Sequence, residues 1–177
     1  MATTPWAIDP THTEIGFKVK HMMFTNVSGR FDQFNGTVET EGDDFANANI
    51  SFQADTASIN TGNADRDAHL KSADFFDAEQ FPNLAFKATE FNKVDDNNFK
   101  LSGDLTVHGV TKPVTLDAEY SGLMTDPWGN TKAGFAVNGK FSRKDFGLTW
   151  NAALETGGVL VSDEVRVNIE MQLVKQA

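Results

Sequence analysis

The sequence predicts an all-β fold of about eight antiparallel strands around one apolar interior, with a short helical insert. Three observations support this prediction. Apolar and polar residues alternate with period two in six segments, which is typical of strands with one buried face. Two further segments show the same alternation with a change of phase, and one stretch has the features of a helix.

The first regular segment places Ile15, Phe17 and Val19 on one face, with charged residues between and beside them. The other regular segments are 48–54, 99–107, 114–120, 133–141 and 165–173. In the remaining two segments the apolar residues change phase, once within 31–38 and once within 84–91. A phase change of one residue indicates a β-bulge, and bulges bend a sheet towards closure.

The helical stretch is expected to run from about Ala64 to Phe76. Asn63 is suited to the N-cap position, and Asp65 and Asp67 would lie at the positive end of the helix dipole. Pro82 prevents the helix from continuing further along the chain. The stretch therefore predicts one helix inserted into an otherwise all-β chain.

Length and charge limit the possible classes of function. The 177 residues fit a single domain, 1–177, and the net charge of −10 makes nucleic acid an unfavourable partner. The chain contains no cysteine, so neither disulfides nor thiolate chemistry are expected. No segment has the eighteen or so consecutive apolar residues of a membrane-spanning helix, so we expect no integral membrane segment.

The residues Met1–Pro10 have neither the basic nor the apolar region of an export signal. The sequence as written therefore predicts a cytoplasmic protein. The alternative is a periplasmic or secreted protein whose leader has been removed.

The interior is rich in phenylalanine, with fifteen Phe against one Tyr. Eight strands with one polar face can form a sandwich or a closed barrel, and the alternation does not separate the two. The pattern alone favours a core packed by the protein's own side chains. However, Gly103 and Gly139 on apolar faces are expected to leave space, and a dry void of this kind would accept an apolar guest.

Motifs for catalysis, metals and cofactors are absent from the sequence. The four histidines, His12, His21, His69 and His108, are too far apart for a linear metal motif, and no nucleophile elbow, P-loop or dinucleotide fingerprint occurs. We therefore expect no catalytic residue, no metal site and no cofactor.

Three polar residues are candidates for contacts with the head of a ligand. Arg66 and His69 lie in the helical stretch, where they either cap and brace the helix or meet a head group at a barrel mouth. Arg143 lies two residues beyond Phe141, so its side chain points to the apolar side if the strand continues. It could pair with an acid such as Asp145 or receive a phosphate or carboxylate.

The residues described so far belong to a series of motifs that resembles the YceI-like family of polyisoprenoid-binding, lipocalin-like proteins. The resemblance extends over nearly the whole chain. Its elements are Trp6-x-Ile8-Asp9-x-x-His12, Phe17-x-Val19-x-His21-Met22, Val27-x-Gly29-x-Phe31, Arg66-Asp67-x-His69-Leu70-Lys71-Ser72-x-Asp74-Phe75-Phe76-Asp77, Phe81-Pro82, Gly103-x-Leu105-Thr106-x-His108-Gly109-x-Thr111-Lys112-Pro113 and Arg143-x-Asp145-Phe146-Gly147-Leu148.

The resemblance implies an extended eight-stranded antiparallel barrel with the helical insert near one end. It also implies a hydrophobic tunnel for an isoprenoid or fatty chain, and a homodimer by analogy. The residues expected to line the tunnel are Phe17, Val19, Phe52, Phe86, Leu101, Leu105, Phe135, Phe141, Ile169 and Met171. Arg66, His69 and Arg143 are the candidates for the head of the ligand.

The function that follows is non-enzymatic binding, sequestration or transport of a polyisoprenoid or similar long-chain amphiphile. Two alternatives remain at this stage. One is an enzyme that modifies an isoprenoid lipid at the tunnel mouth. The other is a stress-related interaction module whose barrel is filled by its own side chains.

Overall fold

The computed structural model describes residues 3–21, 25–73, 75–148 and 163–176. These residues form mostly strands, with one α-helix and three 3-10 turns in the described part of the chain. The strands are β1 (Thr3–Ile8), β2 (Glu14–His21), β3 (Thr25–Phe31), β4 (Phe34–Glu41), β5 (Asp44–Asp55), β6 (Ile59–Asn60), β7 (Asn83–Lys93), β8 (Asn98–Val107), β9 (Val110–Thr125), β10 (Thr131–Ser142) and β11 (Glu164–Lys175). The helix is α1 (Ala64–Lys71), and the 3-10 turns are η1 (Pro10–His12), η2 (Thr56–Ser58) and η3 (Arg143–Phe146).

Within the described residues, eight strands close into a ring by antiparallel pairing. The order is β1-β4-β5-β7-β8-β9-β10-β11, and β1 pairs with β11 to complete the circle. The remaining strands β2, β3 and β6 extend this ring at one end, where β2 pairs with both β11 and β3. The prediction of an eight-stranded antiparallel barrel with a helical insert is confirmed.

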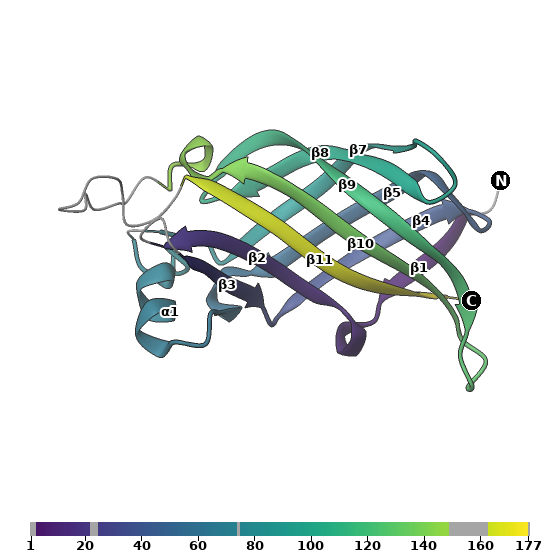
Figure 1. Cartoon of the computed structure of the whole chain (residues 1–177), viewed down its shortest axis with the longest axis horizontal. Helices are drawn as coiled ribbons and strands as arrows, with labels where there is room; N and C mark the ends of the chain where they lie inside the picture. The colour runs from purple at the N-terminus through teal and green to yellow at the C-terminus, as the bar shows by residue number, and fades with distance from the viewer. Residues whose placement is uncertain (1–2, 22–24, 74, 149–162, 177) are drawn as a thin grey trace.

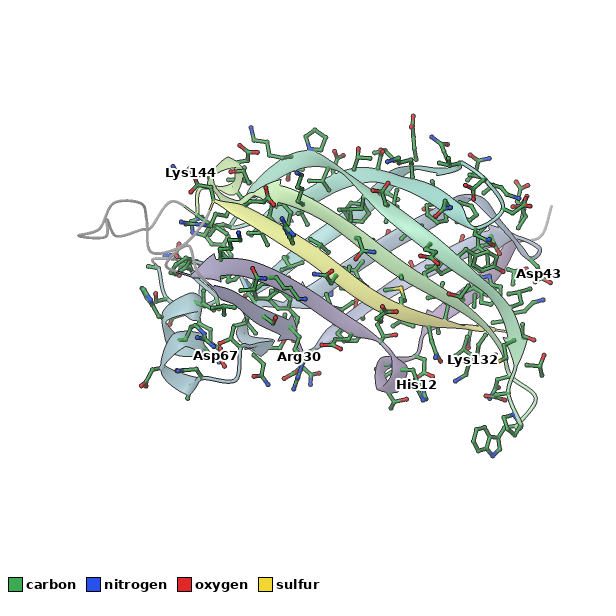
Figure 2. The ribbon with its side chains drawn as sticks, viewed as in Figure 1. His12, Arg30, Asp43, Asp67, Lys132 and Lys144 are labelled. Carbon is green, nitrogen blue, oxygen red and sulfur yellow. The ribbon has the colours of Figure 1, made fainter. Side chains whose placement is uncertain are left out.

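The barrel is elongated, and its two ends differ (Figure 1). Helix α1, the turn η3 and the strands β2 and β3 lie at one end, and the two chain termini lie towards the other. Side chains mark the same two ends in Figure 2, where Asp67 lies on α1 while Asp43 and Lys132 lie at the opposite end. We refer to these as the α1 end and the terminal end.

Of the two predicted bulges, the one within 84–91 is confirmed, and the one within 31–38 was wrong because a turn separates two strands there. The chain bends between β3 and β4, so that Phe31 ends one strand and Phe34 begins the next. In β7 the register with β8 shifts between Ala88 and Glu90, as expected for a bulge. Two further register shifts were not predicted, one between Glu39 and Glu41 in β4 and one between Gly134 and Phe135 in β10.

Helix α1 is shorter than the predicted stretch Ala64–Phe76 and ends at Lys71. Its N-cap is as expected, because the side chain of Asn63 accepts a hydrogen bond from the backbone N–H three residues later at 3.0 Å. The helix ends early because Ser72 adopts an extended conformation. The hydroxyl and N–H of Ser72 both donate to the carbonyl of His69, at 2.5 and 3.1 Å.

The prediction that Gly103 and Gly139 leave space in the interior was wrong. A Cβ at Gly103 would overlap the carbonyl oxygen of Lys87 and lie 2.6 Å from the ring of Phe86. A Cβ at Gly139 would overlap the side chain of Leu116. The larger neighbours therefore already fill the space that these glycines provide.

Replacing Gly103 by Ala is expected to destabilise the barrel by about 1–3 kcal/mol, because the methyl group meets a backbone oxygen that cannot move aside. Gly134→Ala is the matched control, since a Cβ there lies 3.4 Å from Ser121. Urea unfolding of both variants measures the effect. Equal unfolding midpoints for the two variants would contradict the packing described here.

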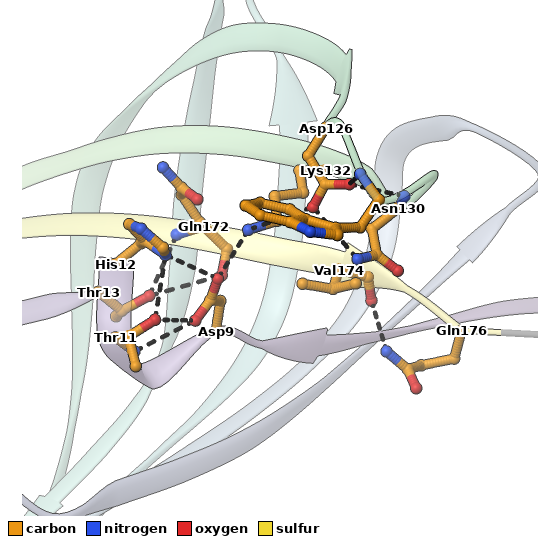
Figure 3. Close-up of polar contacts among 11 residues, drawn as sticks. Asp9, Thr11, His12, Thr13, Asp126, Asn130, Lys132, Gln172, Val174 and Gln176 are labelled. Carbon is orange, nitrogen blue, oxygen red and sulfur yellow. Dashed lines mark hydrogen bonds and ion pairs between the residues drawn. The ribbon is translucent and has the colours of Figure 1, made fainter.

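A polar junction holds the terminal end of the barrel where β1 turns into β2 (Figure 3). One carboxylate oxygen of Asp9 accepts from the backbone N–H and the hydroxyl of Thr11, at 3.1 and 2.8 Å. Its other oxygen lies 2.9 Å from Nδ1 of His12 and 2.9 Å from Nζ of Lys132 on β10. Asp9 thus links the turn between β1 and β2 to β10, a strand that is remote in sequence.

The hydrogen bond from the ammonium group of Lys132 holds the pKa of Asp9 far below its usual range. Burial opposes this shift, and hydrogen bonds from His12 and Thr11 add to it. The two side chains of the ion pair are 14% and 20% exposed, so solvent screens the pair only in part. Because the folded-state pKa is depressed, the stabilisation is present above the ordinary pKa of about 3.9 and decreases below it.

We therefore expect Asp9→Asn to lower the free energy of unfolding by about 1.5–3 kcal/mol at pH 7. The difference from the unsubstituted protein should narrow as the pH falls below about 4. Asp117→Asn is the control, because Asp117 pairs with Lys100 on the exposed surface and should matter little. A difference that stays constant between pH 7 and pH 3 would rule out the ion pair as its source.

Candidate functional site

The barrel encloses a cavity of roughly 620 Å³. This volume lies within the range of about 300–1,000 Å³ that is usual for small-molecule sites. Strand β11 illustrates how the wall is built, because every second residue faces the cavity. These residues are Val165, Val167, Ile169, Met171 and Leu173.

All thirteen residues that the sequence indicated for ligand contact lie on the wall of this cavity. The apolar ones are Phe17, Val19, Phe52, Phe86, Leu101, Leu105, Phe135, Phe141, Ile169 and Met171, and the polar ones are Arg66, His69 and Arg143. That these side chains bind a ligand stays a prediction. The alternation of the strands is sufficient to explain their common orientation.

Sequence analysis missed several aromatic residues of the wall, because they lie where the alternation is interrupted. Phe45 precedes Asn47, whose φ of 63° shifts the phase of β5. Phe91 follows the bulge in β7. Phe75 and Phe76 lie in the loop that was predicted as helix. Of these interruptions, only the phase change before Phe91 was predicted from the sequence.

The ionisable residues of the cavity wall lie at the α1 end. Among the described residues they are Lys20 on β2, Asp65, Arg66 and His69 on α1, and Arg143 on η3. These three elements lie together at one end of the barrel in Figure 1. The cavity therefore has a polar mouth at the α1 end and an apolar body.

Arg66 is held by the loop that precedes its helix. Its Nε donates to the hydroxyl of Thr61 at 2.8 Å, and an Nη donates to the carbonyl of the same residue at 2.8 Å. Asp67 accepts from the N–H and the hydroxyl of Thr61, at 2.9 and 2.5 Å. Because α1 has no fully buried side chain, these hydrogen bonds are important in fixing it at the mouth.

Arg143 is buried, with 3% of its surface exposed. Strand β10 ends at Ser142, so the assumption that the strand continues through Arg143 was wrong, although the side chain still faces the cavity. An Nη donates to the carbonyl of Leu148 at 2.6 Å, and the guanidinium lies 6.0 Å from the ring of Phe75.

Among the described residues, the acid that pairs with this arginine is Asp163, whose carboxylate lies 3.8 Å from the guanidinium, and not the sequence neighbour Asp145. Burial lowers the pKa of Arg143, and the charge of Asp163 opposes that shift. Arg143 therefore joins η3 to the start of β11 and to the loop after α1. The long connection predicted at 148–164 lies mostly outside the described residues, since 149–162 are not among them.

The ring of His69 completes the described mouth. It meets the ring of Phe75 edge-on, with 5.1 Å between the ring centroids. Phe75 is thus in contact with both His69 and Arg143, and it links the helix to η3. The described residues contain no group of three His, Asp or Glu side chains placed to hold a metal ion.

The fold and cavity define the class of protein as a closed antiparallel barrel with an internal apolar cavity and one polar mouth. The YceI-like domain matches residues 6–173, and the chain belongs to this family. It is 38% identical over 164 residues to a UPF0312 protein of Staphylococcus aureus strain N315, covering 92% of this chain and 93% of that one. A Vibrio cholerae UPF0312 protein is 39% identical over 137 residues, covering 77% of this chain and 72% of the relative.

Solved structures agree with this assignment. The Campylobacter jejuni YceI protein superposes with a TM-score of 0.77 at 34% identity and covers 96% of both chains. Burkholderia cenocepacia BcnA gives a TM-score of 0.80 at 20% identity, covering 93% of this chain and 98% of its own. A polyisoprenoid binding domain from Saccharophagus degradans gives 0.70 at 17%, covering 97% and 98%. At these lower identities the last two show the fold alone.

None of the helices in the described ranges is long and apolar enough to cross a membrane.

The loop before α1 offers a test of how the mouth is held. Asp67→Ala should accelerate amide hydrogen exchange at Thr61 about ten- to a hundred-fold, because the amide loses a charged acceptor. Asp65→Ala removes the same charge from the same helical turn without removing this acceptor, and exchange at Thr61 should not change. If both variants accelerate exchange equally, the helix dipole and not the hydrogen bond stabilises the loop.

Proposed function

We propose that this chain binds a polyisoprenoid or similar long-chain amphiphile and sequesters or transports it, without catalysing a reaction on it. The cavity carries this proposal, because its body is lined by apolar side chains and its mouth by polar ones. The polyisoprenoid binding domain of Saccharophagus degradans, which has the same fold, gives the proposal further support.

The apolar body suits the tail of such a ligand. Burial of a methylene group contributes about 0.8 kcal/mol, so three five-carbon units could contribute on the order of 10 kcal/mol as an upper bound. Association costs of roughly 4–15 kcal/mol offset much of this gain. A long tail is therefore needed for tight binding.

The polar mouth suits the head of the ligand. Lys20, Arg66 and Arg143 place an ammonium and two guanidinium groups on the wall at the α1 end. These groups are hydrogen-bond donors, so they favour a head that is anionic or rich in hydrogen-bond acceptors. A prenyl diphosphate or a quinone precursor would meet this requirement.

The alternatives can be separated from binding by experiment. A cavity of roughly 620 Å³ argues against the hypothesis that the barrel is filled by its own side chains. Steady turnover of a prenyl lipid by the purified protein would overturn the non-enzymatic part of the proposal.

Native mass spectrometry of protein purified without detergent tests the ligand class. The proposal expects a reproducible added mass, and lipid extraction should release a compound built of five-carbon units. A bound fatty acid or fatty amide would retain the binding function and replace the isoprenoid. Protein that carries no added mass and takes up no prenyl lipid on incubation would refute the proposal.

Two neighbouring residues of β11 provide a matched pair of variants. Ile169 lines the cavity, whereas Asn168 is exposed on the outer face. Ile169→Glu should reduce lipid retention at least ten-fold, because it places a carboxylate on the apolar wall. Asn168→Glu adds the same charge outside and should retain lipid. Circular dichroism checks that both variants fold, and equal retention would contradict binding inside the barrel.

A further inference from the structure

We infer that a double layer of aromatic rings at the terminal end of the cavity limits the length of the ligand, and that Phe45 sets this limit. The inference rests on the proposed function, because it concerns the depth to which an apolar tail can enter. It adds a specificity-determining residue that lies far from the polar mouth.

The inner layer consists of Phe45 on β5, Phe91 on β7 and Phe135 on β10. All three rings lie on the cavity wall, and the residues are between 3% and 7% exposed. Phe45 meets Phe135 edge-on at 5.1 Å between centroids, and Phe91 lies 6.0 Å from Phe135. Strands β5 and β7 are neighbours, whereas β10 lies across the ring from them. The ring of Phe135 therefore meets those of Phe45 and Phe91 across the interior and closes it.

The outer layer consists of Trp6 on β1, Phe99 on β8 and Tyr120 on β9. None of these residues lies on the cavity wall, and Trp6 and Phe99 are only 2% and 4% exposed. The indole N–H of Trp6 donates to the hydroxyl of Thr40 at 2.8 Å, which fixes the orientation of the ring. The outer layer thus separates the inner rings from solvent.

Phe45, in the inner layer, contacts two rings of the outer layer. Its centroid lies 4.9 Å from that of Trp6 and 5.5 Å from that of Tyr120. Removing its ring would therefore extend the cavity as far as the outer layer. Phe91 contacts one ring of the outer layer, that of Phe99. The two rings form a nearly parallel stack, with 4.6 Å between their centroids and 9° between their planes.

The physical consequence is a limit on affinity. Each methylene that enters the cavity strengthens binding about four-fold, which corresponds to about 0.8 kcal/mol. Once the tail reaches the inner layer, further carbons stay at the mouth and add little. Affinity should therefore rise with tail length and then level off at a length that the inner layer determines.

The experiment uses the full chain, freed of lipid and incubated with a mixture of prenyl alcohols that differ by one five-carbon unit. Native mass spectrometry gives the relative affinity for each length. In the unsubstituted protein affinity should level off at a definite length, and Phe45→Ala should move that length upwards by at least one unit. Phe99→Ala is the matched control, since it removes an equal ring from the outer layer and should leave the limit unchanged.

Loss of a buried ring could also prevent folding, so two further variants accompany the first. Phe45→Leu removes less volume and should still lengthen the limit. Val38→Phe adds a ring to the wall beside Trp6, its cross-strand neighbour, and should shorten the limit by at least one unit.

The outcomes distinguish this inference from the proposed function. If the folded Phe45 and Val38 variants keep the limit of the unsubstituted protein, the aromatic layers do not set ligand length, and binding itself is unaffected. If Phe99→Ala shifts the limit as much as Phe45→Ala, the two-layer assignment is wrong. If the unsubstituted protein binds no prenyl alcohol of any length, the proposed function fails first.

Discussion

Closure of the strand ladder through β1 and β11 is the constraint on which the rest of the structure depends. A pleated strand directs alternate side chains to opposite faces, and in a closed ring one of those faces has no exit to solvent. Every inward residue therefore shares one interior. Where these side chains do not fill that interior, an internal cavity remains that is apolar along its body, as observed here.

The regular pattern of strands is interrupted at both ends of the barrel, and polar groups lie at these interruptions. At the α1 end the strands give way to a short helix and a 3-10 turn, and these carry most of the polar groups of the mouth. At the terminal end, the ion pair between Asp9 and Lys132 connects the turn between β1 and β2 to β10 on the outside of the barrel. Polar networks thus stabilise both ends, while hydrogen-bonded strands and apolar packing stabilise the middle.

Alternation was sufficient to predict an all-β chain and the orientation of residues such as Phe17 and Ile169, because orientation in a strand is a local property. The closed barrel was predicted only through the resemblance to the YceI-like family. Alternation failed for Phe45, because the left-handed conformation of Asn47 reverses the phase nearby. It also failed for the interior at Gly103 and for the acid beside Arg143. The space at Gly103 is filled by residues of the neighbouring strand β7, and Arg143 meets Asp163, which lies twenty positions later in the chain. Such contacts follow from closure of the barrel and not from local sequence.

The contrast between the two ends also determines how a ligand of the proposed kind would be oriented. An apolar body has no means of distinguishing the two directions of an extended chain, so only the ends can do so. At the terminal end the indole N–H of Trp6 is already bound to Thr40, and a head group placed there would lose its hydration without compensation. At the mouth Lys20 and Arg66 line the wall beside solvent-accessible elements. The tail of such a ligand would therefore enter first and its head would stay at α1. The depth of the aromatic layers and the polar groups of the mouth would then act on opposite ends of the same molecule.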